Sequence, residues 1–280
     1  MSKTKITLAI AASYFIFAIL LNSVGTVILQ AINTLGVSKT EASVLEGFKD
    51  LSIAIMSFVV ASFIPRLGYK LAMLGALAVV ALACLSTALI SEFYMFKVLF
   101  AVIGCGFAVV KVSVYSIIGQ VTEDANSHSS LLNTIEGIFM VGVLSGYWIF
   151  TAFIDPSQNN AWLNVYYALA ALTLIVLLSV VIAPIAPAID KNKTDSSLSD
   201  FIAMLKLTYQ PLVLIFIISA FLYVLIEQGV GTWLPTFNNQ VLQLPVAISI
   251  QLASIFAAAL AFGRLVAGQV LKHINWFFVL

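Results

Sequence analysis

The chain has 280 residues, of which 62% are hydrophobic and 9% are charged, and its formal net charge is +1. Soluble domains are roughly 45 to 50% apolar and about 25% charged, so this composition excludes a soluble globular protein and predicts an integral membrane protein. Because the few bases are scattered, nothing indicates a nucleic-acid-binding surface or a polybasic lipid-binding segment.

The amino-terminal segment places Lys3 and Lys5 ahead of an apolar run that continues to about Leu29. The apolar part of a secretory signal covers only about 7 to 15 residues. We therefore predict that this segment is the first membrane span and that it is retained.

Eight stretches have the length of about 20 mostly apolar residues that a helix needs to cross a bilayer. Barrel strands would instead alternate over about ten residues, so we expect an all-α polytopic membrane protein. Six of the predicted spans precede a polar connection and two follow it. They are residues 6–29, 44–64, 71–90, 95–118, 131–154, 162–184, 211–234 and 246–270.

Three parts are expected along the chain. Residues 1–185 form a six-helix bundle, residues 186–210 form a cytoplasmic linker, and residues 211–280 begin a carboxyl-terminal bundle. That second bundle is expected to be incomplete, because the last residues, WFFVL, resemble the opening of a ninth span. In the linker, apolar residues recur at i, i+3, i+4 and i+7, which predicts an amphipathic interfacial helix; a solvated loop with one helical turn is the alternative.

Positively charged residues predict the orientation. Eight bases fall at one set of alternate loops, whereas the other set has only Lys39 and Lys97. The positive-inside rule then places the amino terminus in the cytoplasm. We expect a multi-pass protein of the plasma membrane, or of the inner membrane in a Gram-negative bacterium. The eight bases are Lys3, Lys5, Arg66, Lys70, Lys191, Lys193, Lys206 and Lys272.

Ionisable residues inside spans usually face a bundle interior or an aqueous cavity, and each needs a partner. Glu46, Lys49 and Asp50 stand at i, i+3 and i+4, which puts them on one helical face. We interpret that face as a cavity-lining stripe. For Glu46, an ion pair that extends into the extracellular headgroups is the alternative.

Lys111 is the most deeply placed charge, about 10 Å from the cytoplasmic end of the fourth predicted span at about 1.5 Å per residue. Glu136 lies near the cytoplasmic end of the fifth predicted span, so Lys111 and Glu136 could form an ion pair. Such a pair could simply fix helix packing. Alternatively, Lys111 could hold an anionic or hydroxyl-rich substrate while Glu136 or Asp50 exchanges a proton.

The layout resembles the major facilitator superfamily, in which two six-helix halves rock around a midplane site. The segment ASFIPRLGYK, between the second and third spans, is similar to that family's G-x-x-x-D-R-x-G-x-K loop. Arg66, Gly68 and Lys70 match, whereas Ala61 and Pro65 replace the Gly and the Asp. The resemblance implies a tight turn at Gly68 and a cytoplasmic gate without its usual acid.

Within that family, residues 221–237 (FLYVLIEQGVGTWLPTF) and the later Gly263-Arg264 pair resemble the fucose permease branch of sugar–proton symporters. This resemblance implies that Tyr223 and Glu227 bind substrate from the seventh helix and adds Arg264 to the gate.

Two departures from that branch prevent transfer of its proton carriers. In the fourth helix, Lys111 and Tyr115 replace a Glu and an Asn, and in the first helix LLNSVGT offers Asn22 but no acid. We therefore expect substrate binding at Asn22, Lys49, Lys111, Tyr115, Tyr223 and Glu227. The candidates for proton coupling are Glu46, Asp50 and Glu136.

These features together predict a secondary active transporter that moves a small polar solute, with a sugar or sugar acid as first choice, by alternating access and with proton coupling. An exporter of amphiphilic compounds and a non-transporting sensor of the same fold are the alternatives. His128 and His273 are isolated and no hydrolase motif is present, so we expect no enzymatic activity, metal or cofactor. The expected partners are the bilayer, the solute and a proton, and we expect a monomer.

Overall fold

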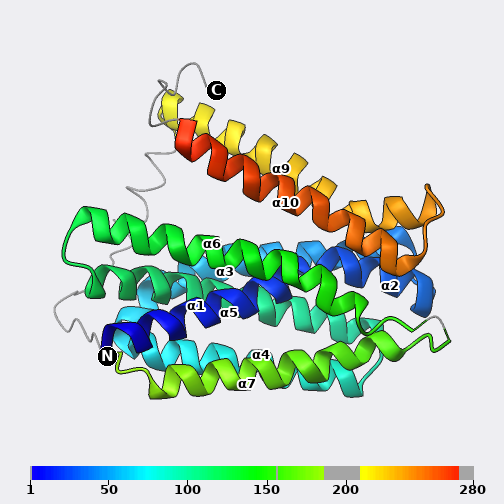
Figure 1. The fold of residues 1–280 in the computed structure, drawn as a ribbon, viewed down its shortest axis with the longest axis horizontal. Helices are drawn as coiled ribbons and strands as arrows, with labels where there is room; N and C mark the ends of the chain where they lie inside the picture. Colours follow the sequence, from blue (N-terminus) through cyan, green and yellow to red (C-terminus); the bar gives the residue numbers. More distant parts are fainter. Residues whose placement is uncertain (1, 156, 186–208, 271–280) are drawn as a thin grey trace.

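A computed structural model describes residues 2–155, 157–185 and 209–270 (Figure 1). The side chains of residues 2, 61–63, 65, 66, 264, 265 and 267–270 lie outside that description. So do the amphipathic segment predicted in the linker and the WFFVL stretch.

The described residues fold into helices, and their one β-bridge joins Asp155 and Gln158. Each predicted span coincides with one helix apart from a few residues at its ends, except that the first divides into two and the sixth begins with a short 3-10 turn. The all-α prediction is therefore confirmed for the described part. The elements are α1 (Ser2–Asn22), α2 (Val24–Leu35), α3 (Lys39–Leu67), α4 (Tyr69–Leu89), α5 (Phe93–Val121), α6 (Ala125–Thr151), η1 (Ala161–Asn164), α7 (Val165–Ile182), α9 (Pro211–Gln240) and α10 (Val246–Val270).

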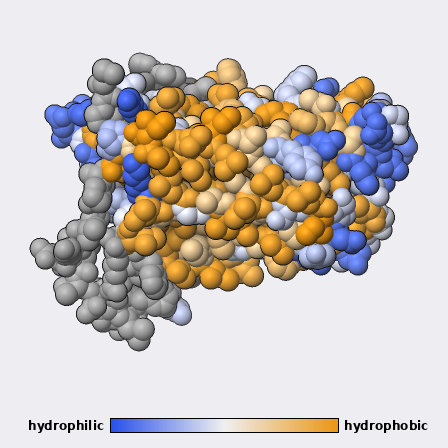
Figure 2. Space-filling view, turned by 90° about the horizontal axis from the view of Figure 1, so that it is seen from below, coloured by the Kyte–Doolittle hydropathy of each residue, from blue (hydrophilic) through white to orange (hydrophobic). Residues whose placement is uncertain are grey.

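By length and composition, seven helical stretches of the described residues could cross a membrane, with α1 and α2 counted together. The 29-residue α3, which carries Glu46, Lys49 and Asp50, is not among the seven. Figure 2 shows a broad apolar band over the middle of one face, with hydrophilic residues gathered toward its two ends. This distribution matches a multi-pass membrane protein.

Helix ends follow local capping chemistry. Ser38 begins α3 with a capping box, in which its hydroxyl accepts a hydrogen bond from the Glu41 amide and the Glu41 carboxylate accepts one from the Ser38 amide. Asp124 begins α6 in the same way with Ser127. Gly68 has φ +88° between α3 and α4, a conformation that side chains disfavour, so the tight turn expected there is present.

Close helix contacts organise the first six spans. The central α1 packs on α5, α6 and α7, while α5 packs on α3 and α4. A Cβ at Gly142 would lie 2.7 Å from the Phe15 carbonyl oxygen, and one at Gly104 would collide with the Lys49 carbonyl oxygen. Glycine at these two positions therefore permits α6 to approach α1 and α5 to approach α3.

The last two helices lie at an angle to the others. They pack on each other, and α9 also contacts α2 while α10 contacts α6. In Figure 1 they meet the bundle near α2 and diverge from it toward the end where the amino terminus lies. The described helices therefore form a wedge that narrows beside α2.

Candidate functional site

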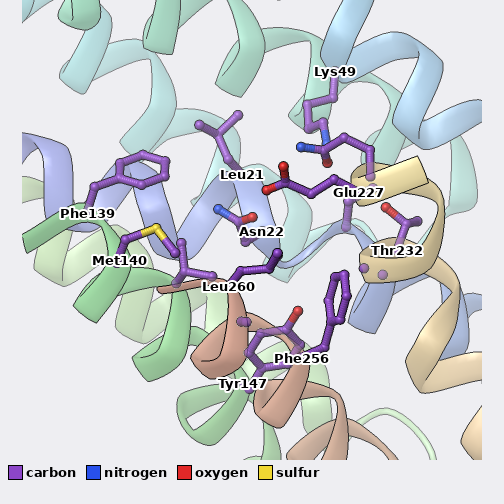
Figure 3. A pocket seen from close by; sticks show the side chains of 16 residues that line it. Leu21, Asn22, Lys49, Phe139, Met140, Tyr147, Glu227, Thr232, Phe256 and Leu260 are labelled. Atoms are coloured by element: carbon purple, nitrogen blue, oxygen red, sulfur yellow. The ribbon is translucent and has the colours of Figure 1, made fainter. Parts of the chain in front are cut away.

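A cavity of about 190 Å³ lies where the wedge narrows, between α1, α2, α3, α6, α9 and α10 (Figure 3). Residues from both ends of the described chain meet there. The lining residues are Leu21, Asn22, Val24, Gly25, Lys49, Phe139, Met140, Val143, Tyr147, Glu227, Gln228, Gly231, Thr232, Phe256, Ala257 and Leu260.

The cavity has two chemically different walls. In Figure 3, Lys49 from α3, Asn22 from α1 and Glu227 from α9 point toward the same part of the cavity. On the other side, α6 and α10 contribute mainly apolar and aromatic groups, among them Phe139 and Phe256. A few convergent polar groups facing an apolar wall are typical of small-molecule sites.

The break between α1 and α2 falls at this cavity. The Asn22 side-chain amide donates to the Ala18 carbonyl at 2.9 Å, and the Ser23 hydroxyl donates to the Leu20 carbonyl at 2.7 Å. The two side chains thus bond carbonyls at the end of α1 where the helix is interrupted.

Lys49 supplies the base of the polar wall. Its side chain is 6% exposed, whereas that of its partner Asp50 is 50% exposed, and the Lys49 Nζ lies 3.3 Å from Asp50 Oδ1. A buried cation requires compensation, and a carboxylate open to water on one side provides only part of it. Since an ammonium group has three donors, Lys49 retains hydrogen-bonding capacity toward the cavity.

Glu46 lies one turn before Lys49 and makes a hydrogen bond with α9, one of the last two helices. Its Oε1 accepts a hydrogen bond of 2.7 Å from the hydroxyl of Thr232, a residue of α9 that is 4% exposed. A Cβ at Gly25 would collide with the Thr232 carbonyl oxygen, so α2 and α9 are in backbone contact at the same level. These contacts close the cavity on the α2 side.

Lys111, Tyr115 and Glu136 form a second cluster, on α5 and α6. The Tyr115 hydroxyl donates to Glu136 Oε1 at 2.7 Å, and the Lys111 Nζ lies 5.8 Å from the centre of the Tyr115 ring. An aromatic group connects this cluster to the cavity, because Phe139 lines the cavity and packs against Tyr14, which in turn packs against Tyr115.

The direct Lys111–Glu136 ion pair considered from the sequence is absent. The described residues form two ion pairs, Lys49–Asp50 and Lys3–Glu123. Tyr115 takes the place of the lysine at Glu136 because its hydroxyl reaches the carboxylate. Lys111 is instead exposed and contacts aromatic rings.

Tyr223 and Lys70 lie away from the cavity lining. Tyr223 is 53% exposed on α9 and is not among the lining residues. Lys70 donates to the carbonyls of Val181 and Ala183 at 2.8 and 2.7 Å, which ties the start of α4 to the end of α7. The side chains of Arg66 and Arg264 lie outside the described residues.

Sequence reasoning missed several lining residues, namely Phe139, Met140, Tyr147, Gln228, Thr232 and Phe256. Gln228 and Thr232 carry a usable signal, since polar side chains within a span tend to face other helices or a cavity. The aromatic residues carry none, because any apolar position of a span can face lipid or protein equally well. No cluster of His, Cys, Asp or Glu that could hold a metal ion occurs among the described residues.

Comparison with known proteins places this geometry in a family. No curated protein matches the sequence. A crystal structure of the D-xylose–proton symporter has a TM-score of 0.74 and 13% identity, covering 97% of this chain and 70% of that one. Two structures of the nucleoside transporter NupG, one of them a variant, have TM-scores of 0.65 and 0.71 at 16% identity. The variant covers 98% of this chain and 68% of its own, and the other structure covers 89% and 62%.

Likeness at these identities shows a shared fold. The family assignment comes from the sequence, because residues 10–280 match the profile of the Major Facilitator Superfamily. The chain belongs to the Major Facilitator Superfamily.

Proposed function

We propose that this protein is a secondary active transporter that moves a small polar solute, with a sugar or sugar acid as first choice, by alternating access coupled to protons. The observation that carries the proposal is the cavity at the narrow end of the wedge, where Lys49 and Asn22 of the first bundle face Glu227 of the second. A solute held there contacts both groups of helices. In transporters of this type, such a site lies between two halves that rock against each other.

The size and chemistry of the cavity favour a small, hydrogen-bonding solute. The cavity volume is about 190 Å³. The amides of Asn22 and Gln228 offer donors and acceptors, Lys49 offers donors, and Glu227 accepts. The D-xylose symporter among the structural neighbours supports a sugar, whereas NupG together with the aromatic wall makes a nucleoside the competing candidate.

Proton coupling is proposed for acids whose hydrogen-bond partners change as the wedge opens and closes. Glu46 bonds Thr232 across the two helix groups, so separating α3 from α9 exposes its carboxylate to water. Glu136 bonds Tyr115 within the first bundle and Asp50 pairs with Lys49, so their partners change only if solute competes. We propose that each carboxylate exchanges its proton at the step in which it exchanges its partner for water or solute.

The membrane arrangement follows from the base distribution. We place residues 1–185 and residues 211–280 in two bundles of a multi-pass protein of the plasma membrane, with the amino terminus in the cytoplasm. The wedge widens toward the amino terminus (Figure 1), so this conformation opens toward the cytoplasm and is closed outside by the contacts around Thr232.

Uptake by reconstituted vesicles tests the proposal. Purified protein in proteoliposomes is given radiolabelled D-xylose, D-glucuronate, uridine or an amphiphilic cation, with and without a pH gradient that is acidic outside. We expect a sugar to accumulate only with the gradient, and a protonophore to abolish accumulation. Equal uptake without the gradient contradicts proton coupling, and movement of the amphiphilic cation alone identifies an exporter.

A further inference from the structure

A second cavity, also of about 190 Å³, lies at the end of the molecule far from the amino terminus. It shares no lining residue with the central cavity. Three elements build it: the end of α2, the connection from α6 into η1, and the first residue of α10. Its lining residues are Gln30, Asn33, Thr34, Ile154, Asp155, Gln158, Asn159, Trp162 and Val246.

Gln30 brings a buried polar side chain to this cavity. It is 3% exposed and lines the cavity. Buried polar groups in native structures nearly always have a partner, and leaving one unpaired costs about 1 to 3 kcal/mol. The carboxamide can therefore pair with a water molecule or a ligand in the cavity.

The chemistry of the lining selects the class of ligand. Four carboxamides, those of Gln30, Asn33, Gln158 and Asn159, supply both donors and acceptors. No base lines the cavity, and Asp155 adds an acid. The Ser157 hydroxyl and amide donate to Asp155 Oδ1 at 2.6 and 2.8 Å and lower the pKa of Asp155, so the carboxylate is ionised near neutral pH. An anion is thus disfavoured, whereas hydroxyl groups, which both donate and accept, can pair with the lining.

We propose that this cavity is an external binding site for a neutral polyhydroxylated solute, such as a monosaccharide or a polyol, separate from the central cavity. Gln30 forms its floor, and the exposed amides of Asn33 and Asn159 form its rim. The site does not depend on the transport function proposed above, because its lining residues and its ligand chemistry are independent of the central cavity.

The site also lies at the boundary, here called the seam, between the first bundle and the pair of helices α9 and α10. Val246 of α10 lines it together with residues of α2, and beside it the Asn33 side-chain amide donates to Asn239 Oδ1 of α9 at 3.1 Å. A solute bound here contacts elements on both sides of that seam. Occupancy therefore stabilises the arrangement in which α2 and α10 are close together.

Trp162 offers a local reporter, since it lines the cavity and its indole nitrogen lies 3.3 Å from the Thr34 hydroxyl. Replacement of the other tryptophans, Trp148, Trp233 and Trp276, by Phe leaves Trp162 as the single emitter. Titration of the purified full chain with D-glucose, D-xylose or myo-inositol should shift its emission saturably with at least one of them. D-Glucuronate differs from glucose by a carboxylate and should require at least a tenfold higher concentration.

Two substitutions connect the signal to the cavity. Gln30→Leu should abolish the saturable shift, and Asn159→Ala, in an exposed loop where folding is not at risk, should weaken it at least threefold. Lys49→Met, in the central cavity, should leave the saturable emission shift unchanged, even if this variant no longer transports solute. Failure of this site can therefore be distinguished from failure of the proposed function.

Three results would overturn the proposal. No saturable shift with any of the three neutral probes means that water alone fills the cavity. An equal or tighter response to D-glucuronate contradicts the ligand class. An unchanged response in both the Gln30 and the Asn159 variants places the binding elsewhere.

Discussion

In the orientation and function proposed above, the hydrogen bond between Thr232 and Glu46 determines how firmly the outer end is closed. Thr232→Val keeps the shape of the side chain but removes its donor, so the carboxylate of Glu46 loses the 2.7 Å bond. Hydrogen bonds to charged groups contribute about 1.5 to 3 kcal/mol. At about 1.4 kcal/mol per factor of ten, the outward-open population should rise about 10- to 150-fold.

Labelling from outside the cell measures this population. Cys84 and Cys105 are replaced by Ser, and Val24, which is 3% exposed and lines the central cavity, is replaced by Cys. A membrane-impermeant maleimide then reaches the new thiol from outside only while the outer end is open. Thr232→Val should accelerate labelling of intact cells by the factor given above.

Thr236 supplies a matched control. It lies one turn later on the same helix and is 4% exposed, but its hydroxyl has no hydrogen-bond partner among the residues that the structure describes. Thr236→Val removes the same group without breaking a bond and should leave the labelling rate unchanged. If both variants label at the same rate, the Thr232–Glu46 bond does not hold the outer end closed and the reasoning fails.

The other predictions concern the two lysines and one helix cap. Lys49→Met should raise the Kd of the transported solute about 10- to 150-fold in calorimetric titration, because one charge-assisted bond of about 1.5 to 3 kcal/mol is lost; an unchanged Kd would place the solute elsewhere. Lys111→Met should slow uptake of D-glucuronate only about two- to fivefold, since exposed charge pairs contribute about 0.2 to 1 kcal/mol, and should leave D-xylose uptake unchanged; equal effects on both sugars would contradict a role in anion binding. Ser127 holds the pKa of Asp124 below its usual value, so the cap stabilises α6 at neutral pH and is lost as the pH falls through that lowered pKa. Hydrogen exchange of the first amides of α6 should then accelerate in acid for the natural chain but not for Asp124→Asn, which caps without titrating.

The spans could be predicted from the sequence because apolar length is a local property. All eight predicted stretches lie in helices apart from a few residues at their ends, and the turn at Gly68 follows from one residue. The interruption at Ser23 could not be foreseen. Its neighbours are apolar enough to continue one helix, and Ser23 itself keeps right-handed helical dihedral angles, with φ −73° and ψ −13°.

Some of the predicted site residues meet at one cavity and others do not, because a charge within a span indicates a cavity but not which one. The structure brings Asn22, Lys49 and Glu227 to one cavity. Lys111 shares their sequence signal but lies on another surface, with Tyr115 between it and the nearest acid. Which intramembrane charges meet depends on tertiary helix packing, and the spacing along one helix carries no information about it.

Thr232 connects solute binding to the closure of the outer end. Its side chain lines the central cavity, its hydroxyl bonds Glu46, and its backbone lies against Gly25. A ligand can shift a conformational equilibrium only by the difference between its affinities for the two states. A solute that displaces the Thr232 hydroxyl from Glu46 weakens the closed outer end by up to the value of that bond, and a solute that leaves it intact does not. For the transporter proposed here, we therefore expect solutes that reach Thr232 to promote outward opening, and we expect a solute that binds only the aromatic wall formed by α6 and α10 to occupy the cavity without moving the helices.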